Sequence, residues 1–220
     1  IVFQKIVGQK LGWGYDYPKL VAVERDPQTQ AAVYSNLTHL EIAAKLKNFK
    51  KILVVLHGFT GETRTQFLPS TGGSGSPLLD LADKHGYQMI LAYDYDSLNT
   101  PIKETAQALK TKLAAAGIGQ GHGKTVHLMA HSMGGVVARW FIENEGGNTI
   151  INHLIMVGTP NGGTPWPNVL DMLKLAASFA LNKITLPGIP VAIIGWLLDK
   201  AKLVGDVDVV TNDLKTKSVF

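Results

Sequence analysis

The sequence has 220 residues, 45% of them hydrophobic, which is enough for one sizeable domain with a buried core. The net charge of +4 is small, and no lysine or arginine cluster is interleaved with aromatic residues, so nucleic acid is not an expected partner. The absence of cysteine excludes disulfides, thiolate catalysis and cysteine-based metal sites. It leaves the compartment open between cytoplasmic and secreted.

No transmembrane segment is predicted. The longest uncharged apolar run, residues 184–198, contains two prolines and is shorter than the roughly 20 residues that a spanning helix needs. The chain begins at Ile1 without methionine and shows no basic segment followed by an apolar signal region. We therefore expect a processed product or a fragment of a longer polypeptide.

The first 57 residues of the chain contain three predicted strands. Residues 1–7 and 20–24 are typical of short strands separated by a Gly/Tyr/Pro turn region. Residues 51–57 form a continuous apolar run, as in a strand whose two sheet faces are covered by helices. The role of residues 1–50 stays open, since they carry no recognisable chemistry.

From residue 87 onward, strands and helices alternate. Strands are predicted at 87–93, 124–130 and 150–157. Between them, one helix begins near Pro101 with apolar residues every three or four positions and ends at Gly117, and a second carries the apolar stripe 136–141. This alternation predicts an α/β fold with a mostly parallel sheet and helices on both faces.

Residues 165–205 interrupt this alternation with two prolines and two strongly apolar helical stretches. The segment is too long for a simple loop and is predicted to be a helical insertion. Its apolar side chains either pack only on the core and each other, or form a lid whose underside faces an acyl chain. The large apolar residues in question are Trp166, Phe179, Ile193, Ile194, Trp196 and Leu197.

The most informative stretch is residues 125–135, where an apolar strand ends at Ser132 and an apolar-faced helix follows. Small residues stand two positions before and after the serine, Ala130 and Gly134. This layout is typical of a nucleophile elbow, in which a tight strand-to-helix turn presents a serine hydroxyl above a sheet. It departs from G-x-S-x-G only by alanine in the first position.

A serine nucleophile needs a base and an oxyanion hole. The backbone N–H of Met133, directly after the serine, is the first expected donor. The second is expected from the backbone N–H of Phe59, because Gly58 allows a sharp turn after the strand 51–57. His57 and His131 are predicted to brace the elbow and its neighbouring loop by hydrogen bonds.

These motifs together carry a family resemblance. His57-Gly58-Phe59 and Ala-His-Ser-Met-Gly-Gly at 130–135 resemble the α/β-hydrolase lipases and esterases, in particular bacterial lipase-type proteins related to the inositol-deacylase group. Residues 156–164 look like the Gly-Thr-Pro turn after the next strand in these lipases, and residues 213–220 are similar to the segment where the chain leaves the cap.

The resemblance implies a hydrolase core at 1–164, a helical cap at 165–205 and a return to the core at 206–220, with the C-terminal strands missing. In this fold the triad acid and histidine follow the serine in the chain. Only His153 follows Ser132, at the beginning of a strand, where catalytic groups are not expected. Five aspartates follow in or beside the cap, and none ends a core strand: Asp171, Asp199, Asp206, Asp208 and Asp213.

Two interpretations therefore stay open. In the favoured one, the chain is a truncated serine ester hydrolase that forms an acyl-enzyme on Ser132, its triad acid and histidine lying beyond Phe220. The expected substrate is a small acyl ester or lipid, and this interpretation allows contact with a lipid interface. No metal or cofactor is required. In the alternative, the chain is a hydrolase-like module that binds an acyl ligand or a protein partner. A zinc site at His127 and His131 is not predicted, because their spacing lies on a strand and not on a helix.

Overall fold

The computed structural model of the protein describes residues 17–59, 61–68, 75–97 and 100–163. The predicted strand at 1–7, the predicted cap at 165–205 and the return to the core at 206–220 lie outside these residues. All the helices and strands below belong to one compact unit. None of these helices is both long and apolar enough to cross a membrane.

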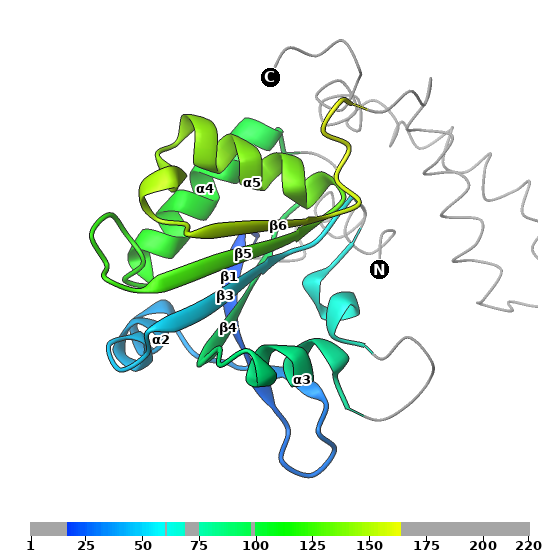
Figure 1. Ribbon diagram of the computed structural model, residues 1–220, viewed down its shortest axis with the longest axis vertical. Coiled ribbons are helices and arrows are strands. Elements are labelled where there is room, and N and C mark those ends of the chain that lie inside the picture. Colours follow the sequence, from blue (N-terminus) through cyan, green and yellow to red (C-terminus); the bar gives the residue numbers. More distant parts are fainter. Residues whose placement is uncertain (1–16, 60, 69–74, 98–99, 164–220) are drawn as a thin grey trace, which may run out of the picture. The chain divides into compact units, whose positions relative to one another are not determined.

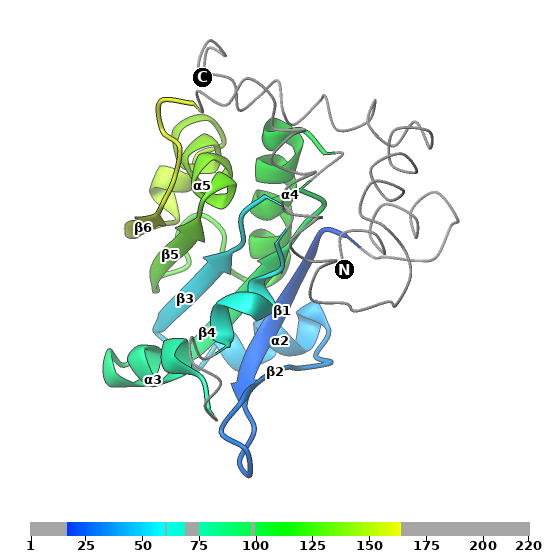
Figure 2. The same ribbon diagram turned by 90° about the vertical axis from the view of Figure 1, so that its right-hand side faces the viewer.

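The described residues form a six-stranded sheet with the order β2-β1-β4-β3-β5-β6, which Figure 2 shows edge to edge. Strands β3, β4, β5 and β6 are parallel, and the β1–β2 hairpin joins β4 in antiparallel orientation. The strands are β1 (Lys19–Arg25), β2 (Ala32–Tyr34), β3 (Lys51–Leu56), β4 (Met89–Asp94), β5 (Thr125–His131) and β6 (His153–Val157).

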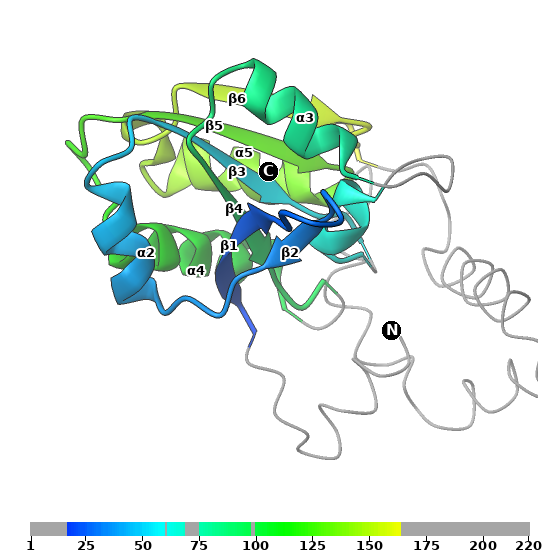
Figure 3. The same ribbon diagram turned by 90° about the horizontal axis from the view of Figure 1, so that it is seen from below.

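Helices cover both faces of this sheet (Figure 1). Seen from below, α3 and α4 lie on opposite sides of the strands (Figure 3). The helices are α2 (His39–Leu46), α3 (Pro77–Lys84), α4 (Ile102–Ala115) and α5 (Met133–Asn144), with short 3₁₀ turns η1 (Thr63–Phe67) and η2 (Gly147–Thr149). The predicted mostly parallel α/β architecture is thereby confirmed.

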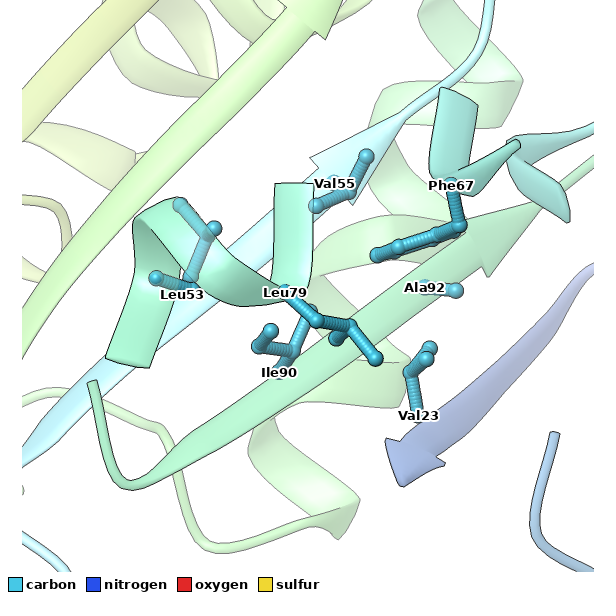
Figure 4. Packing of buried hydrophobic residues seen from close by; sticks show 8 residues of the cluster. Val23, Leu53, Val55, Phe67, Leu79, Ile90 and Ala92 are labelled. Carbon is cyan, nitrogen blue, oxygen red and sulfur yellow. The ribbon is translucent and has the colours of Figure 1, made fainter. Parts of the chain in front are cut away.

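The hydrophobic core on the α3 side joins alternate residues of three strands to a helix and a 3₁₀ turn. Figure 4 shows this cluster, in which Phe67 of η1 and Leu79 of α3 lie over the sheet. The strand residues are Val23, Leu53, Val55, Ile90 and Ala92. The other residues of β3 face the opposite layer, so the whole strand from Ile52 to Leu56 is at most 2% exposed. This explains why its sequence is a continuous apolar run.

Local signals explain the boundaries of several elements. Gly117 ends α4 and Gly146 ends α5, each with a positive φ that glycine adopts without strain. The last predicted strand begins three residues later than expected, at His153. The reason is Asn152, whose backbone N–H donates to the carbonyl of Val126 while its side-chain oxygen accepts from the N–H of Val126.

Candidate active site

Ser132 occupies the sharp turn between β5 and α5. Its backbone has φ 52° and ψ −126°, in the positive-φ region that residues other than glycine rarely adopt. Its N–H donates to the carbonyl of Val157 at 2.8 Å, which ties the turn to the end of β6. The side chain does not cap α5, and its Oγ has no hydrogen-bond partner among the described residues. Within the described part of the chain, the hydroxyl is therefore uncommitted.

The turn requires glycine on both of its sides. A Cβ on Gly134 would lie 2.3 Å from the carbonyl oxygen of His57, and a Cβ on Gly58 would lie 2.8 Å from the Cβ of Ser132. The same Cβ on Gly58 would lie 3.0 Å from the Nδ1 of His131. The structure therefore brings Gly58, His131 and Ser132 together at the carboxyl ends of β3 and β5, with His57 and Gly134 packed directly behind them.

The two backbone N–H groups predicted as oxyanion donors belong to Met133 and Phe59. Met133 is the first residue of α5, so its N–H has no acceptor within the helix. Phe59 follows Gly58, at which an added Cβ would lie 2.8 Å from the Cβ of Ser132. A helix N-terminus also carries partial positive charge, which favours an anion at this point. That the N–H groups of Met133 and Phe59 together form an oxyanion hole stays a prediction of the sequence.

His57 is committed to the scaffold. The backbone N–H of Tyr95 donates to its Nε2 at 3.2 Å, so Nε2 accepts, and its Nδ1 lies 2.7 Å from the carbonyl of Gly58, so Nδ1 donates. The Tyr95 hydroxyl donates to the carbonyl oxygen of His57 at 2.7 Å, and the two rings stack with centroids 4.2 Å apart. Both ring nitrogens of this buried histidine are therefore occupied, and it cannot serve Ser132 as a base.

A buried carboxylate, that of Asp94, anchors the segment that follows β3. Asp94, the last residue of β4, accepts hydrogen bonds from the N–H and the hydroxyl of Thr63, both at 2.8 Å. The hydroxyl of Tyr34 contacts the Thr63 hydroxyl in turn. Burial first, and then the negative charge of Asp94, raises the pKa of Tyr34, so this phenol stays protonated. Sequence reasoning missed this cluster, although an aspartate at the end of a buried strand was a visible signal.

The one histidine that follows Ser132 in the sequence, His153, lies away from the serine. His153 is the first residue of β6 and contacts His127 of β5, near the amino ends of these strands. The aspartates considered in the sequence, from Asp171 to Asp213, lie outside the described residues. Within the described part of the chain, no histidine with a free ring nitrogen and a carboxylate partner accompanies Ser132.

Comparisons with known proteins give a family and a fold. Residues 19–207 match the family model described as a domain of unknown function, DUF7379. No curated protein matches the chain significantly. The propeptide form of the Bacillus licheniformis lipase BlEst2 matches with a TM-score of 0.51 and 19% identity, over 90% of this chain and 33% of that chain.

Two further solved structures are similar at lower scores. The mature form of the same lipase has a TM-score of 0.48 and 21% identity, over 77% of this chain and 56% of that chain. A carboxylesterase structure from the thaumarchaeon Nitrososphaera gargenis has a TM-score of 0.46 and 14% identity, over 76% and 58%. The chain thus spans between one third and three fifths of these proteins. From the strand order and the similarity to the BlEst2 propeptide form, the chain has the α/β-hydrolase fold, and it belongs to the DUF7379 family.

Proposed function

We propose that this chain carries the nucleophile and the oxyanion hole of a serine ester hydrolase. The observation that carries the proposal is the backbone of Ser132, held at φ 52° in a strand-to-helix turn by two close backbone approaches. Such strain is retained where the surrounding structure enforces it, and it occurs at functional sites. Here it leaves a serine hydroxyl uncommitted beside the N-terminus of α5.

In the proposed mechanism, Ser132 Oγ attacks the ester carbonyl carbon and its proton passes to a histidine. The carbonyl oxygen becomes an oxyanion, which the N–H groups of Met133 and Phe59 stabilise. Collapse of this intermediate expels the alcohol, which takes the proton from the histidine, and leaves an acyl group on Ser132. Water then hydrolyses the acyl-enzyme through the same oxyanion site. The histidine and its acid are proposed to lie beyond Phe220.

The substrate is proposed to be an acyl ester with an apolar chain. The apolar composition of residues 165–205 supports this, because a polar substrate such as a sugar would not require so many large apolar side chains. The preference for acyl-chain length is measured with a series of p-nitrophenyl esters from acetate to decanoate. We expect kcat/KM to rise at least ten-fold from acetate to octanoate, and a flat series would argue against an apolar acyl site.

The nucleophile is tested with a fluorophosphonate probe and intact-mass spectrometry, on the protein expressed from its complete reading frame. We expect one probe adduct, which Ser132→Ala abolishes together with ester hydrolysis. Ser35→Ala, which removes a hydroxyl from the β2 side of the sheet, is the matched control and should keep both. No adduct on the wild-type protein would overturn the proposal in favour of a non-catalytic binding module, and turnover by Ser132→Ala would exclude this serine.

A further inference from the structure

Two histidine rings from neighbouring strands meet near the amino ends of the parallel strands β5 and β6. His127 of β5 and His153 of β6 are direct partners in the parallel register, so their side chains leave the same face of the sheet. The Nε2 of His127 and the Nδ1 of His153 are 2.9 Å apart. His153 is exposed and His127 is partly buried, so solvent reaches the pair.

The relative orientation of the rings is informative. Their planes are 82° apart and their centroids 4.6 Å apart. A straight end-on hydrogen bond of this N–N length would separate the centroids by about 5.2 Å, so the rings are tilted out of line. Two imidazoles bound to one metal ion at about 2.05 Å with a right angle between them would place the nitrogens about 2.9 Å and the centroids about 4.5 Å apart.

We propose that His127 Nε2 and His153 Nδ1 form a binding site for a divalent transition-metal ion with a preference for imidazole. The right angle suits the square-planar or octahedral geometry of Cu²⁺ and Ni²⁺, whereas a tetrahedral ion such as Zn²⁺ would need the nitrogens about 3.3 Å apart. Among the described residues, no group of three or more metal-ligating side chains occurs, so these two nitrogens are the protein ligands that the proposal names.

The surroundings of His127 support this role. The hydroxyl of Tyr87 lies 2.7 Å from its Nδ1, at the ring nitrogen that the metal does not use. A protein histidine ligand ordinarily donates its second N–H to such a partner, which fixes the ring and its tautomer. In the metal-bound form, His127 carries its proton on Nδ1 and donates it to the Tyr87 hydroxyl, and His153 carries its proton on Nε2.

The electrostatics act in both directions. Burial, the neighbouring His153 and Lys51 all lower the pKa of His127. Lys51 itself repels a cation. Its Nζ, however, lies over the Tyr87 ring, 4.9 Å from the centroid, and donates to the carbonyl of His85. This lysine therefore lowers the affinity of the site without blocking the two nitrogens.

The site is independent of the proposed esterase chemistry. His127 precedes Ser132 by five residues on the same strand, a separation of about 16 Å along it. A failure of the metal proposal therefore leaves the serine proposal untouched, and the reverse also holds.

The test is a Ni²⁺ titration by calorimetry at pH 7.5, on the full protein purified without a histidine tag. We expect one equivalent to bind to the wild type. His127→Gln and His153→Gln should each weaken binding at least ten-fold, and Tyr87→Phe about ten-fold. His39→Gln is the matched control, since His39 is exposed at the start of α2, and it should bind as the wild type does.

A second measurement needs no variant. Ni²⁺ should protect His127 and His153 from diethylpyrocarbonate, read by peptide mass spectrometry, while His39 and His85 stay reactive. The proposal is overturned by the absence of saturable binding to the wild type, by wild-type affinity in His153→Gln, or by a lack of selective protection.

Discussion

The two ends of the same β5 strand are built in opposite ways. At its carboxyl end, Ser132 is positioned by backbone atoms that approach so closely that Gly58 and Gly134 cannot carry a side chain. At its amino end, His127 is positioned by side chains, namely His153 and Tyr87. The backbone contacts at Ser132 fix the geometry tightly and require small residues at defined positions of the local sequence. The side-chain contacts at His127 tolerate substitution and impose no such local pattern.

The largest effect should come from filling the backbone contact. Gly134→Ala places a methyl group 2.3 Å from the carbonyl oxygen of His57, so the elbow or β3 must move. We expect a loss of about 3 kcal/mol in the free energy of unfolding, measured by urea denaturation. Gly119→Ala is the matched control, because a Cβ at Gly119 would have no neighbour within 4 Å and the φ of this residue is not positive. Equal stability of the two variants would contradict the tight approach.

Asp94→Ala should come next. It leaves the buried N–H and hydroxyl of Thr63 without their acceptor. We expect the free energy of unfolding to fall by up to about 3 kcal/mol and the loop beside Ser132 to loosen. Asp83→Ala removes the same side chain from an exposed ion pair with Arg25 and should cost less than about 1 kcal/mol. Chemical denaturation of both variants measures the difference, and equal costs would mean that Asp94 does not fix the loop.

A smaller effect is expected at the nucleophile itself. Glycine adopts a positive φ without strain, so Ser132→Gly should be about 1 kcal/mol more stable than Ser132→Ala. Thermal unfolding of the two variants at one pH gives the comparison. If alanine proved as stable as glycine, the serine backbone would not have the strained conformation described above.

The smallest effect concerns the histidine pair. The pKa of His127 is lowered from 6.5 in the folded protein, so the unfolded chain takes up the proton first as the pH falls. The contribution of His127 to the free energy of unfolding is therefore fully present above pH 6.5. It decreases as the pH falls through this value towards the lower pKa of the folded protein. His127→Gln should lose less stability between pH 7.5 and 5.5 than the wild type, whereas His39→Gln should behave as the wild type. Parallel pH profiles for the wild type and His127→Gln would contradict the shift.

Sequence patterns predicted the parallel strands well, because helices cover both faces and the strands are therefore continuous apolar runs. They also placed the helices 102–115 and 133–144, whose apolar residues follow a clear helical period. The elements β2, α2 and α3 were not predicted. Yet α2 begins with a capping box formed by Thr38 and Glu41, and α3 begins with Ser76 as its cap followed by proline. These signals were present but the elements are short.

The candidate site divides in the same way. Ser132, Gly134 and Met133 are contiguous, and the tight turn restricts its neighbours to small residues, so one short motif predicts them. The Asp94–Thr63 and His127–His153 contacts join residues 31 and 26 positions apart. Nothing in either local sequence specifies its partner, and only the order of the strands brings them together.

Ser132 lies between a buried strand, β3, and a partly exposed strand, β6, and this difference affects which part of the sheet unfolds first. Strand β3 is at the centre of the sheet and almost fully buried, so its amides should exchange with solvent only on global unfolding. Strand β6 is at the edge of the described sheet, and three of its apolar residues, Ile155, Met156 and Val157, are more than 40% exposed. Because the Ser132 amide is bonded to Val157, brief detachment of β6 would release the serine turn while β3 and the core behind it stay folded.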